Sequence, residues 1–326
     1  LSSYNTGLVS GTSATADYIG GLVGYAISGA QTISSSYNTG AISNSTGRNV
    51  NVGGLVGALG SSGASTIQGS YNTGAIYGGY NIGGLVGSAS NASITTSYNT
   101  GTVTGFYCPT SNNCNNSGGV GGILGTNMTA RTGSTYVTIS ESYNQGTIKG
   151  PTGVGGLVGH GRNNRILDSY NKGNVSGSFS YNEQGVSTWL TNYNGGIIGR
   201  TDGGTTLSRV YNAGLRVNQD DSESYMGVYG AFIGTMTDVF YLQASTGSVS
   251  SGQRALSSSD MQTLSNFTNY SELIWRYDSS VNSGYPILIN NTPVSNSATI
   301  DVTFTTINIT DRTYGDDFNL NSFCTA

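Results

Sequence analysis

Three charged residues recur at one position of a repeated motif, where they could act together. Glu141, Asp168 and Arg209 each stand two residues before the tyrosine of successive copies of that motif. If the copies stack as neighbouring strands, two carboxylates lie about 5 Å apart beside a guanidinium. Such a pair could do general acid/base chemistry, for example on a glycosidic bond. The alternative, which we favour, is a surface charge ladder in which Arg209 offsets two like charges. We therefore predict no catalytic residue and no enzyme activity.

Two other features could hold a metal ion. Asp220-Asp221-Ser222-Glu223 is an acidic run, but it lacks the spaced acidic positions of a dedicated calcium loop. His160 is the single histidine, and no second cysteine pair accompanies it, which disfavours a zinc site. We expect a solvated loop and a surface residue respectively, and we predict no metal and no cofactor.

The cysteines suggest an oxidising compartment. Cys108 and Cys114 bracket the polar loop Cys-Pro-Thr-Ser-Asn-Asn-Cys. Two cysteines this close in an Asn- and Ser-rich loop are typical of a local disulfide. Two unrelated thiols are the alternative, and Cys324 has no evident partner.

The composition excludes several classes of protein. The 326 residues include 51 Gly and 22 Tyr, but only 9% are charged and the net charge is −4. Glycine does not recur at every third residue as in collagen, and the few Lys and Arg argue against a nucleic-acid partner. No run of about 18 apolar residues predicts a membrane span.

Two linked motifs repeat along the chain. Ser-Tyr-Asn-x-Gly-x-Val/Ile begins at Ser3, Ser36, Ser70, Ser97, Ser142 and Ser169, with degenerate copies at Val210 and Phe240. Gly-Gly-Leu/Ile-Val/Leu/Ile-Gly begins at Gly20, Gly53, Gly83, Gly121, Gly155 and Gly195. Short β-branched runs without helical spacing separate them. They predict an all-β, right-handed parallel β-helix of about seven coils, with three short strands per coil stacked at about 4.8 Å.

Alignment of the copies predicts columns that run from coil to coil. Aliphatic residues four before and five after each tyrosine should form the core. The asparagines should form a hydrogen-bonded structural ladder: Asn5, Asn38, Asn72, Asn99, Asn144, Asn171 and Asn212. Because residues two apart in a strand share a face and the charged column does not belong in a narrow core, the tyrosines are expected to form an outward surface ladder: Tyr4, Tyr37, Tyr71, Tyr98, Tyr143, Tyr170 and Tyr211. A bend that turns them inward as core is the alternative.

The units resemble the GLUG repeat. Its Gly-Leu-x-Gly core is matched at Gly21–Gly24, Gly54–Gly57, Gly84–Gly87 and Gly156–Gly159. This resemblance implies a large bacterial surface protein, similar to filamentous-haemagglutinin-like adhesins. GLUG repeats also flank some IgA-specific metallopeptidases, but the zinc-binding His-Glu-x-x-His helix of those enzymes is absent from this sequence.

Three regions follow from these patterns. Residues 1–247 are expected to form the β-helix. Residues 248–291 resemble the closing segment that follows GLUG arrays, with a short helix N-capped at Ser257, and should cover the open last coil. Residues 292–326 are expected to hold a linker and a partial β-sandwich-like module, since Thr313–Asp316 resembles the signature of MBG- or YDG-type modules.

These expectations combine into one functional hypothesis. The chain is predicted to be a non-enzymatic structural or adhesive segment of a large secreted protein at the bacterial cell surface, itself a piece of a longer chain. Its partners would be neighbouring copies or modules of the same fibre, or a cell-surface glycan or protein. Loops at about 105–119, 126–138 and 178–193 are candidates for the binding face. A carbohydrate-active enzyme or glycan-binding β-helix is the alternative.

Overall fold

The computed structural model describes residues 2–12, 18–26, 28–44, 50–60, 63–105, 118–127, 135–151, 153–177, 193–215, 227–243 and 252–292. The chain divides into two compact units, Leu1–Pro293 and Val294–Ala326, and all of these residues belong to the first. The cysteines Cys108, Cys114 and Cys324, the acidic run Asp220–Glu223 and the module expected after residue 292 lie outside the described residues. Among the described residues, no helix is long and apolar enough to cross a membrane.

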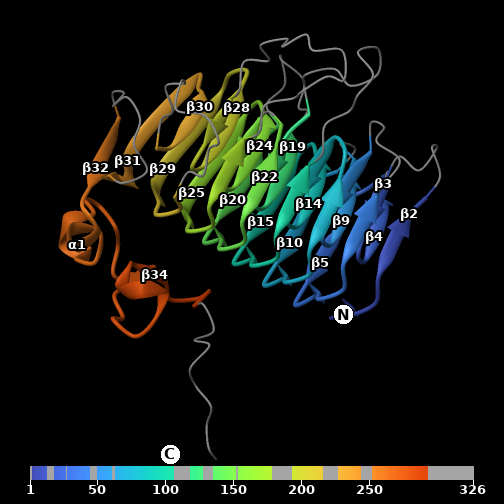
Figure 1. The fold of residues 1–326 in the computed structure, drawn as a ribbon, viewed down its shortest axis with the longest axis horizontal. Coiled ribbons are helices and arrows are strands. Elements are labelled where there is room, and N and C mark those ends of the chain that lie inside the picture. Colours follow the sequence, from blue (N-terminus) through green and yellow to red (C-terminus); the bar gives the residue numbers. More distant parts are fainter. Residues whose placement is uncertain are drawn as a thin grey trace, which may run out of the picture. The chain divides into compact units, whose positions relative to one another are not determined.

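The first unit is a parallel β-helix, as predicted (Figure 1). Each full coil contributes short strands to four parallel sheets, which we call sheets A to D in chain order from the tyrosine motif. Sheet A contains β1 (Tyr4–Asn5), β5 (Thr32–Ser34), β6 (Tyr37–Asn38), β10 (Ser65–Gln68), β11 (Tyr71–Asn72), β15 (Ala92–Thr95), β16 (Tyr98–Asn99), β20 (Val137–Ser140), β21 (Tyr143–Asn144), β25 (Asn164–Asn171), β29 (Thr205–Asn212), β31 (Gly234–Leu242) and β32 (Gln253–Leu256).

The other three sheets are narrower. Sheet B contains β2 (Val9–Gly11), β7 (Ile42–Asn44), β12 (Ile76–Gly78), β17 (Val103–Gly105), β22 (Ile148–Gly150) and β26 (Val175–Gly177). Sheet C contains β3 (Tyr18–Gly20), β8 (Asn51–Gly53), β13 (Asn81–Gly83), β18 (Val120–Gly121), β23 (Val154–Gly155) and β27 (Asn194–Gly195). Sheet D contains β4 (Val23–Ala26), β9 (Val56–Leu59), β14 (Val86–Ala89), β19 (Leu124–Asn127), β24 (Val158–Gly161), β28 (Ile198–Thr201) and β30 (Tyr229–Ala231).

The number of strands per coil differs from the expected three. A complete coil such as 65–89 has five strand segments in four sheets. One extra break falls two residues before the tyrosine, where Thr96 and Glu141 take positive φ values of 44° and 46°. Asp168 and Arg209 have the same bend, with φ values of 43° and 52°, but lie inside the continuous strands β25 and β29. The other falls at the Gly-Gly corner between sheets C and D. Alternating apolar residues do not reveal either break, because both are set by backbone bends.

The aliphatic core has two parts. One lies between sheets A and D and includes Ile67, Leu85 and Ile139. The other lies between sheets B and C and includes Ile42, Ile82 and Ile148. Asparagine and glycine separate the two at the corner of the repeat. A Cβ on Gly54 would overlap the carbonyl of Gly84 and lie 2.6 Å from Cγ of Asn72, so a side chain has no room there. This contact explains physically why the Gly-Gly and Asn motifs recur together.

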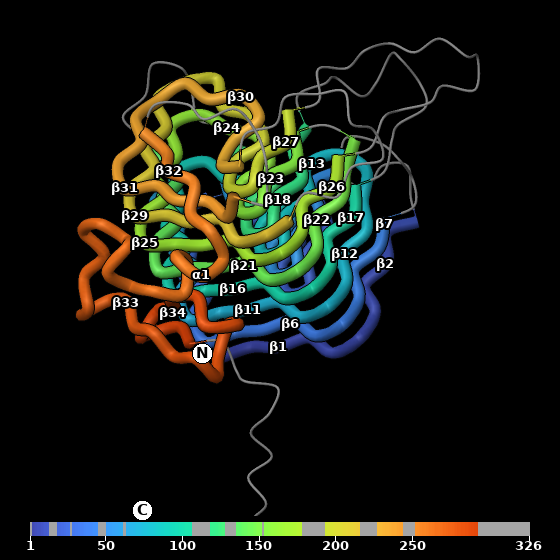
Figure 2. Tube along the Cα trace, turned by 60° about the vertical axis from the view of Figure 1, so that its left-hand side comes forward, coloured from blue at the N-terminus to red at the C-terminus, as the bar shows by residue number. Residues whose placement is uncertain are grey.

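The closing segment, residues 252–292, begins as a further strand and then turns back. β32 pairs in parallel with β31. Helix α1 (Ser258–Met261) follows with Ser257 as its N-cap, and then come two 3-10 helices, η2 (Leu264–Asn266) and η3 (Asn282–Gly284), and the antiparallel pair β33 (Trp275–Arg276) and β34 (Ile287–Leu288). Figure 2 shows this orange-red segment beside the tyrosine strands. The segment therefore lies along the side of several coils, rather than only over the last one as expected.

Candidate functional site

The asparagine column forms a continuous hydrogen-bonded ladder. In each coil the side-chain Nδ2 donates to Oδ1 of the next asparagine at 2.7–2.8 Å, from Asn5 through to Asn212. The same Nδ2 also donates to the carbonyl of the glycine two residues later, at 2.8 Å in Asn72. At the last step, Asn212 donates to the carbonyl of Gly227 at 2.9 Å. Buried amides that are satisfied in this way fix both the spacing and the register of the coils.

The seven tyrosines form one stack. Their ring centroids are 4.9–5.2 Å apart and neighbouring ring planes differ by no more than 9°. Their backbones pair in register, from Tyr4↔Tyr37 to Tyr170↔Tyr211, and Tyr211 pairs with Phe240 of the degenerate eighth copy. Each interior ring therefore has both faces in contact with other rings, and only its edge and hydroxyl can face outward.

The surface position expected for the tyrosines is wrong at one end of the stack. Tyr4 is 66% exposed, whereas Tyr143, Tyr170 and Tyr211 are at most 1% exposed. The last three are buried because aromatic and aliphatic residues of the closing segment pack on them: Met261, Phe267, Tyr270, Trp275, Tyr285 and Leu288. The repeat itself carries no sign of this cover, which comes from residues 50 or more positions away along the chain.

Burial also changes the acidity of the tyrosines. It raises the pKa of Tyr98 to about 12, with a smaller contribution from the hydroxyl of Tyr71. Burial raises the pKa of Tyr170 and Tyr211 well above the ordinary value of 10. Each of these two hydroxyls has a polar neighbour. The side chain of Gln145 partly offsets the rise in the pKa of Tyr170, while Tyr211 donates to the carbonyl of Pro286 at 2.6 Å and accepts from Asn282 at 3.0 Å.

The charged column supports the closing segment. Arg209 binds Asp168 with two bonds, Nε to Oδ1 at 2.6 Å and NH2 to Oδ2 at 2.7 Å. The indole Nε1 of Trp275 donates to the same Oδ1 at 3.2 Å, and Asp168 is 6% exposed. Glu141 instead accepts from Asn290 at 3.1 Å. Asp168 thus has both oxygens engaged, an arrangement that suits docking better than proton transfer.

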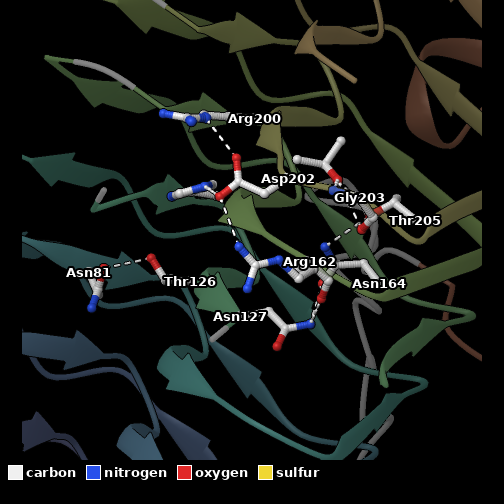
Figure 3. Close-up of polar contacts among 11 residues, drawn as sticks. Asn81, Thr126, Asn127, Arg162, Asn164, Arg200, Asp202, Gly203 and Thr205 are labelled. Carbon is white, nitrogen blue, oxygen red and sulfur yellow. Dashed lines mark hydrogen bonds and ion pairs between the residues drawn. The ribbon is translucent and has the colours of Figure 1, made fainter. Parts of the chain in front are cut away.

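A second charged group lies where sheet D turns into sheet A (Figure 3). The carboxylate of Asp202 contacts Nε2 of His160 at 3.1 Å, NH2 of Arg162 at 3.4 Å and Nε of Arg200 at 3.0 Å. Burial alone would raise the pKa of Asp202, but His160, Arg200 and Arg162 outweigh it, so the pKa is lowered. The expected surface position of His160 is wrong, since its side chain is 6% exposed.

Two shorter polar rows, which the repeat alignment did not predict, accompany this group. Asn81 donates to Asn51 at 2.7 Å and accepts from Thr126 at 2.5 Å. Asn127 donates to Asn164 at 2.9 Å, which in turn contacts Thr205 at 3.4 Å. The signal that could have revealed them is the recurrence of Asn or Thr at the ends of the sheet C and D strands. Across the described ranges, no group of three or more His, Cys, Asp or Glu could hold a metal ion.

Comparisons with known proteins agree with the repeat. The family model of the GLUG motif matches residues 78–104. That span runs from the end of β12 to β17 and is one complete coil, whose register with the neighbouring coils extends the same pattern in both directions. A search of curated proteins found no match to the sequence.

One solved structure has a similar fold. It is a crystal structure of a protein from Bacteroides ovatus, provisionally named an immunoglobulin A1 protease. The similarity covers 80% of this chain and 86% of that one, with a TM-score of 0.50 and 14% sequence identity. At this identity the likeness concerns the fold alone.

Proposed function

We propose that this chain is a non-enzymatic scaffold segment of a large secreted bacterial surface or fibre protein, where it mediates adhesion or self-assembly. The observation that carries this proposal is the continuity of three columns along the coils. Aliphatic residues, asparagines and tyrosines each remain in register from one coil to the next. A solenoid built in this way holds whatever it displays at fixed spacing.

The charged residues support a structural role. The two carboxylates that could have done acid/base chemistry have different partners: Asp168 binds Arg209 and Trp275, and Glu141 binds Asn290. A general acid must exchange its proton with a substrate, whereas Asp168 is buried under the closing segment. The GLUG match is consistent with a repeat segment of a larger surface protein.

Two assays test the proposal: adhesion of beads that carry the chain, and cleavage of polysaccharides. Beads coated with the chain should adhere to cells or to one another, and a panel of polysaccharides should remain uncleaved after prolonged incubation. Cleavage that is lost in the Glu141→Gln/Asp168→Asn double variant would favour the alternative, a carbohydrate-active enzyme. Electron microscopy of the native assembly distinguishes the two scaffold roles, because self-assembly predicts filaments and adhesion alone predicts separate rods.

A further inference from the structure

Arginine is scarce in this chain but is concentrated at one place. The sequence contains 12 Lys and Arg in total, and three of them, Arg162, Arg165 and Arg200, lie on two neighbouring coils where sheet D meets sheet A. Arg165 is exposed and its guanidinium lies 3.6 Å from the ring centroid of Tyr136. Arg200 lies 5.1 Å from the ring centroid of Tyr193. These stacks hold two long side chains in position at the surface.

Within the described ranges, one carboxylate is bound to this cluster, and it leaves an excess of positive charge. Asp202 contacts Arg162 through one nitrogen and Arg200 through Nε. Three guanidiniums and one carboxylate give a local charge of about +2, in a chain whose net charge is −4. Glu141, Asp168 and Asp238 belong to the column at the bend of sheet A and face the closing segment. The cluster therefore attracts an external anion.

The outer face of sheet A beside this cluster carries rows of hydroxyl groups. One row consists of Thr32, Thr66, Ser93, Thr138, Thr206 and Thr235, and Arg165 occupies the same register between Thr138 and Thr206. Its members are half-buried or exposed, so their hydroxyls reach solvent. The spacing along the row is that of the coils, about 4.8 Å. Because these strands are paired on both sides, the face offers side chains rather than an open edge to a peptide.

We propose that this face binds a carboxylate-bearing polysaccharide, which lies along the hydroxyl row with its acidic groups at Arg162, Arg165 and Arg200. A polymer of hydroxylated sugars matches a row of Ser and Thr side chains, and planar guanidiniums are suited to bind carboxylates. The inference rests on the proposed adhesive function and names the ligand class. In this proposal the carboxylate of Asp202 competes with those of the polysaccharide, because it already binds two of the three guanidiniums.

The test measures binding of the folded chain to polygalacturonate and to fully methyl-esterified polygalacturonate, which has the same backbone without the charge. We expect the ester to bind at least about ten-fold more weakly, and added salt to weaken binding of the acid form. Arg162→Gln/Arg165→Gln/Arg200→Gln should weaken binding of the acid form by about ten-fold or more. The control Lys149→Gln/Arg254→Gln/Arg276→Gln removes the same charge from exposed positions away from the hydroxyl row, and its affinity should stay within about two-fold of the parent chain.

Asp202→Asn provides a test of opposite sign. It removes the internal carboxylate, so it should tighten binding of polygalacturonate several-fold. The proposal is overturned if the folded parent chain does not bind polygalacturonate, binds the ester equally well, or loses as much affinity in the control triple variant. Any of these results with adhesion of coated beads intact would leave the proposed function standing, whereas loss of adhesion in every form of the chain would refute that function instead.

Discussion

An asparagine in the middle of the ladder should contribute far more to the free energy of unfolding than the asparagine at its end. In Asn99→Ala three side-chain hydrogen bonds are lost: Nδ2 to Oδ1 of Asn144, Nδ2 to the carbonyl of Gly101, and the bond that Asn72 donates to Oδ1, each at 2.8 Å. Asn99 is fully buried, so water does not replace them. At about 1 kcal/mol per bond, with a further cost for acceptors left unpaired, the free energy of unfolding should fall by about 3–5 kcal/mol.

Asn5→Ala is the matched control. Asn5 donates to Asn38 at 2.7 Å and to Gly7, but it lies in the first coil described and is only partly buried. Water can satisfy the groups left behind, so the loss should be below about 1 kcal/mol. Urea unfolding followed by circular dichroism measures both values, and a coincident transition in tryptophan fluorescence checks that unfolding is cooperative. Equal losses of unfolding free energy in Asn99→Ala and Asn5→Ala would refute the conclusion that the buried ladder fixes the register of the coils.

Asn99→Asp adds a pH dependence to the same test. An ionised carboxylate at this position would be buried against the carbonyl of Gly101 and Oδ1 of Asn144, so its pKa in the folded state should lie above the unfolded value of about 3.9. When the pKa of a group is higher in the folded state than in the unfolded state, the group is tolerated at pH values below its unfolded pKa. It then destabilises the fold as the pH rises through its folded pKa. The variant should therefore lose less stability near pH 3 than near pH 7, relative to the parent chain at the same pH. The opposite order would contradict the burial of this rung.

Four further predictions follow from the same contacts. Trp275→Ala should detach the closing segment, since it removes a fully buried indole and its bond to Asp168; it should cost about 3–5 kcal/mol and speed hydrogen exchange in residues 258–292. Ultraviolet titration should show Tyr98 ionising near pH 12 and Tyr170 and Tyr211 later; because these folded pKa values are raised, the stability they contribute is present below pH ~10 and is lost above it. Gly54→Ala should cost more than about 3 kcal/mol in a urea titration, whereas Gly7→Ala, whose added Cβ would meet only Asn5 at 3.7 Å, should cost less than about 1. The lowered pKa of Asp202 means that its ion pairs stabilise the fold above the ordinary carboxyl range and are lost on acidification, so Asp202→Asn should reduce the acid sensitivity of the melting temperature.

The register of the coils was predictable because each position of the repeat is occupied by residues with one physical role. Ile33, Ile67 and Ile94 occupy equivalent positions in the sequence and are adjacent in the sheet. Asn72 and Asn99 likewise follow a tyrosine and are joined by a hydrogen bond. A parallel stack leaves each residue type beside its own copy, so alignment of the sequence on itself gives the register directly.

The features that the sequence did not predict depend on contacts between residues that lie far apart in the chain. Trp275 lies 107 positions from Asp168 and Asn291 lies 194 positions from Ser97, and both contacts decide which tyrosines are buried. His160 and Asp202, by contrast, meet within the repeat, because β24 and β28 pair in register in neighbouring coils. No spacing rule predicts the contacts of Trp275 and Asn291, because they depend on where a segment outside the repeat turns back.

The tyrosine stack also decides where a ligand can bind on this solenoid. Exposed aromatic rings commonly bind sugars through their faces, and a row of seven tyrosines suggests such a platform. The rings between Tyr37 and Tyr170, however, have neighbours about 5 Å away on both sides, so their faces are already in contact. The closing segment then covers the rings at the C-terminal end. The stack is therefore a seam that holds coils and closing segment together, and recognition falls to the face that carries hydroxyls and guanidiniums.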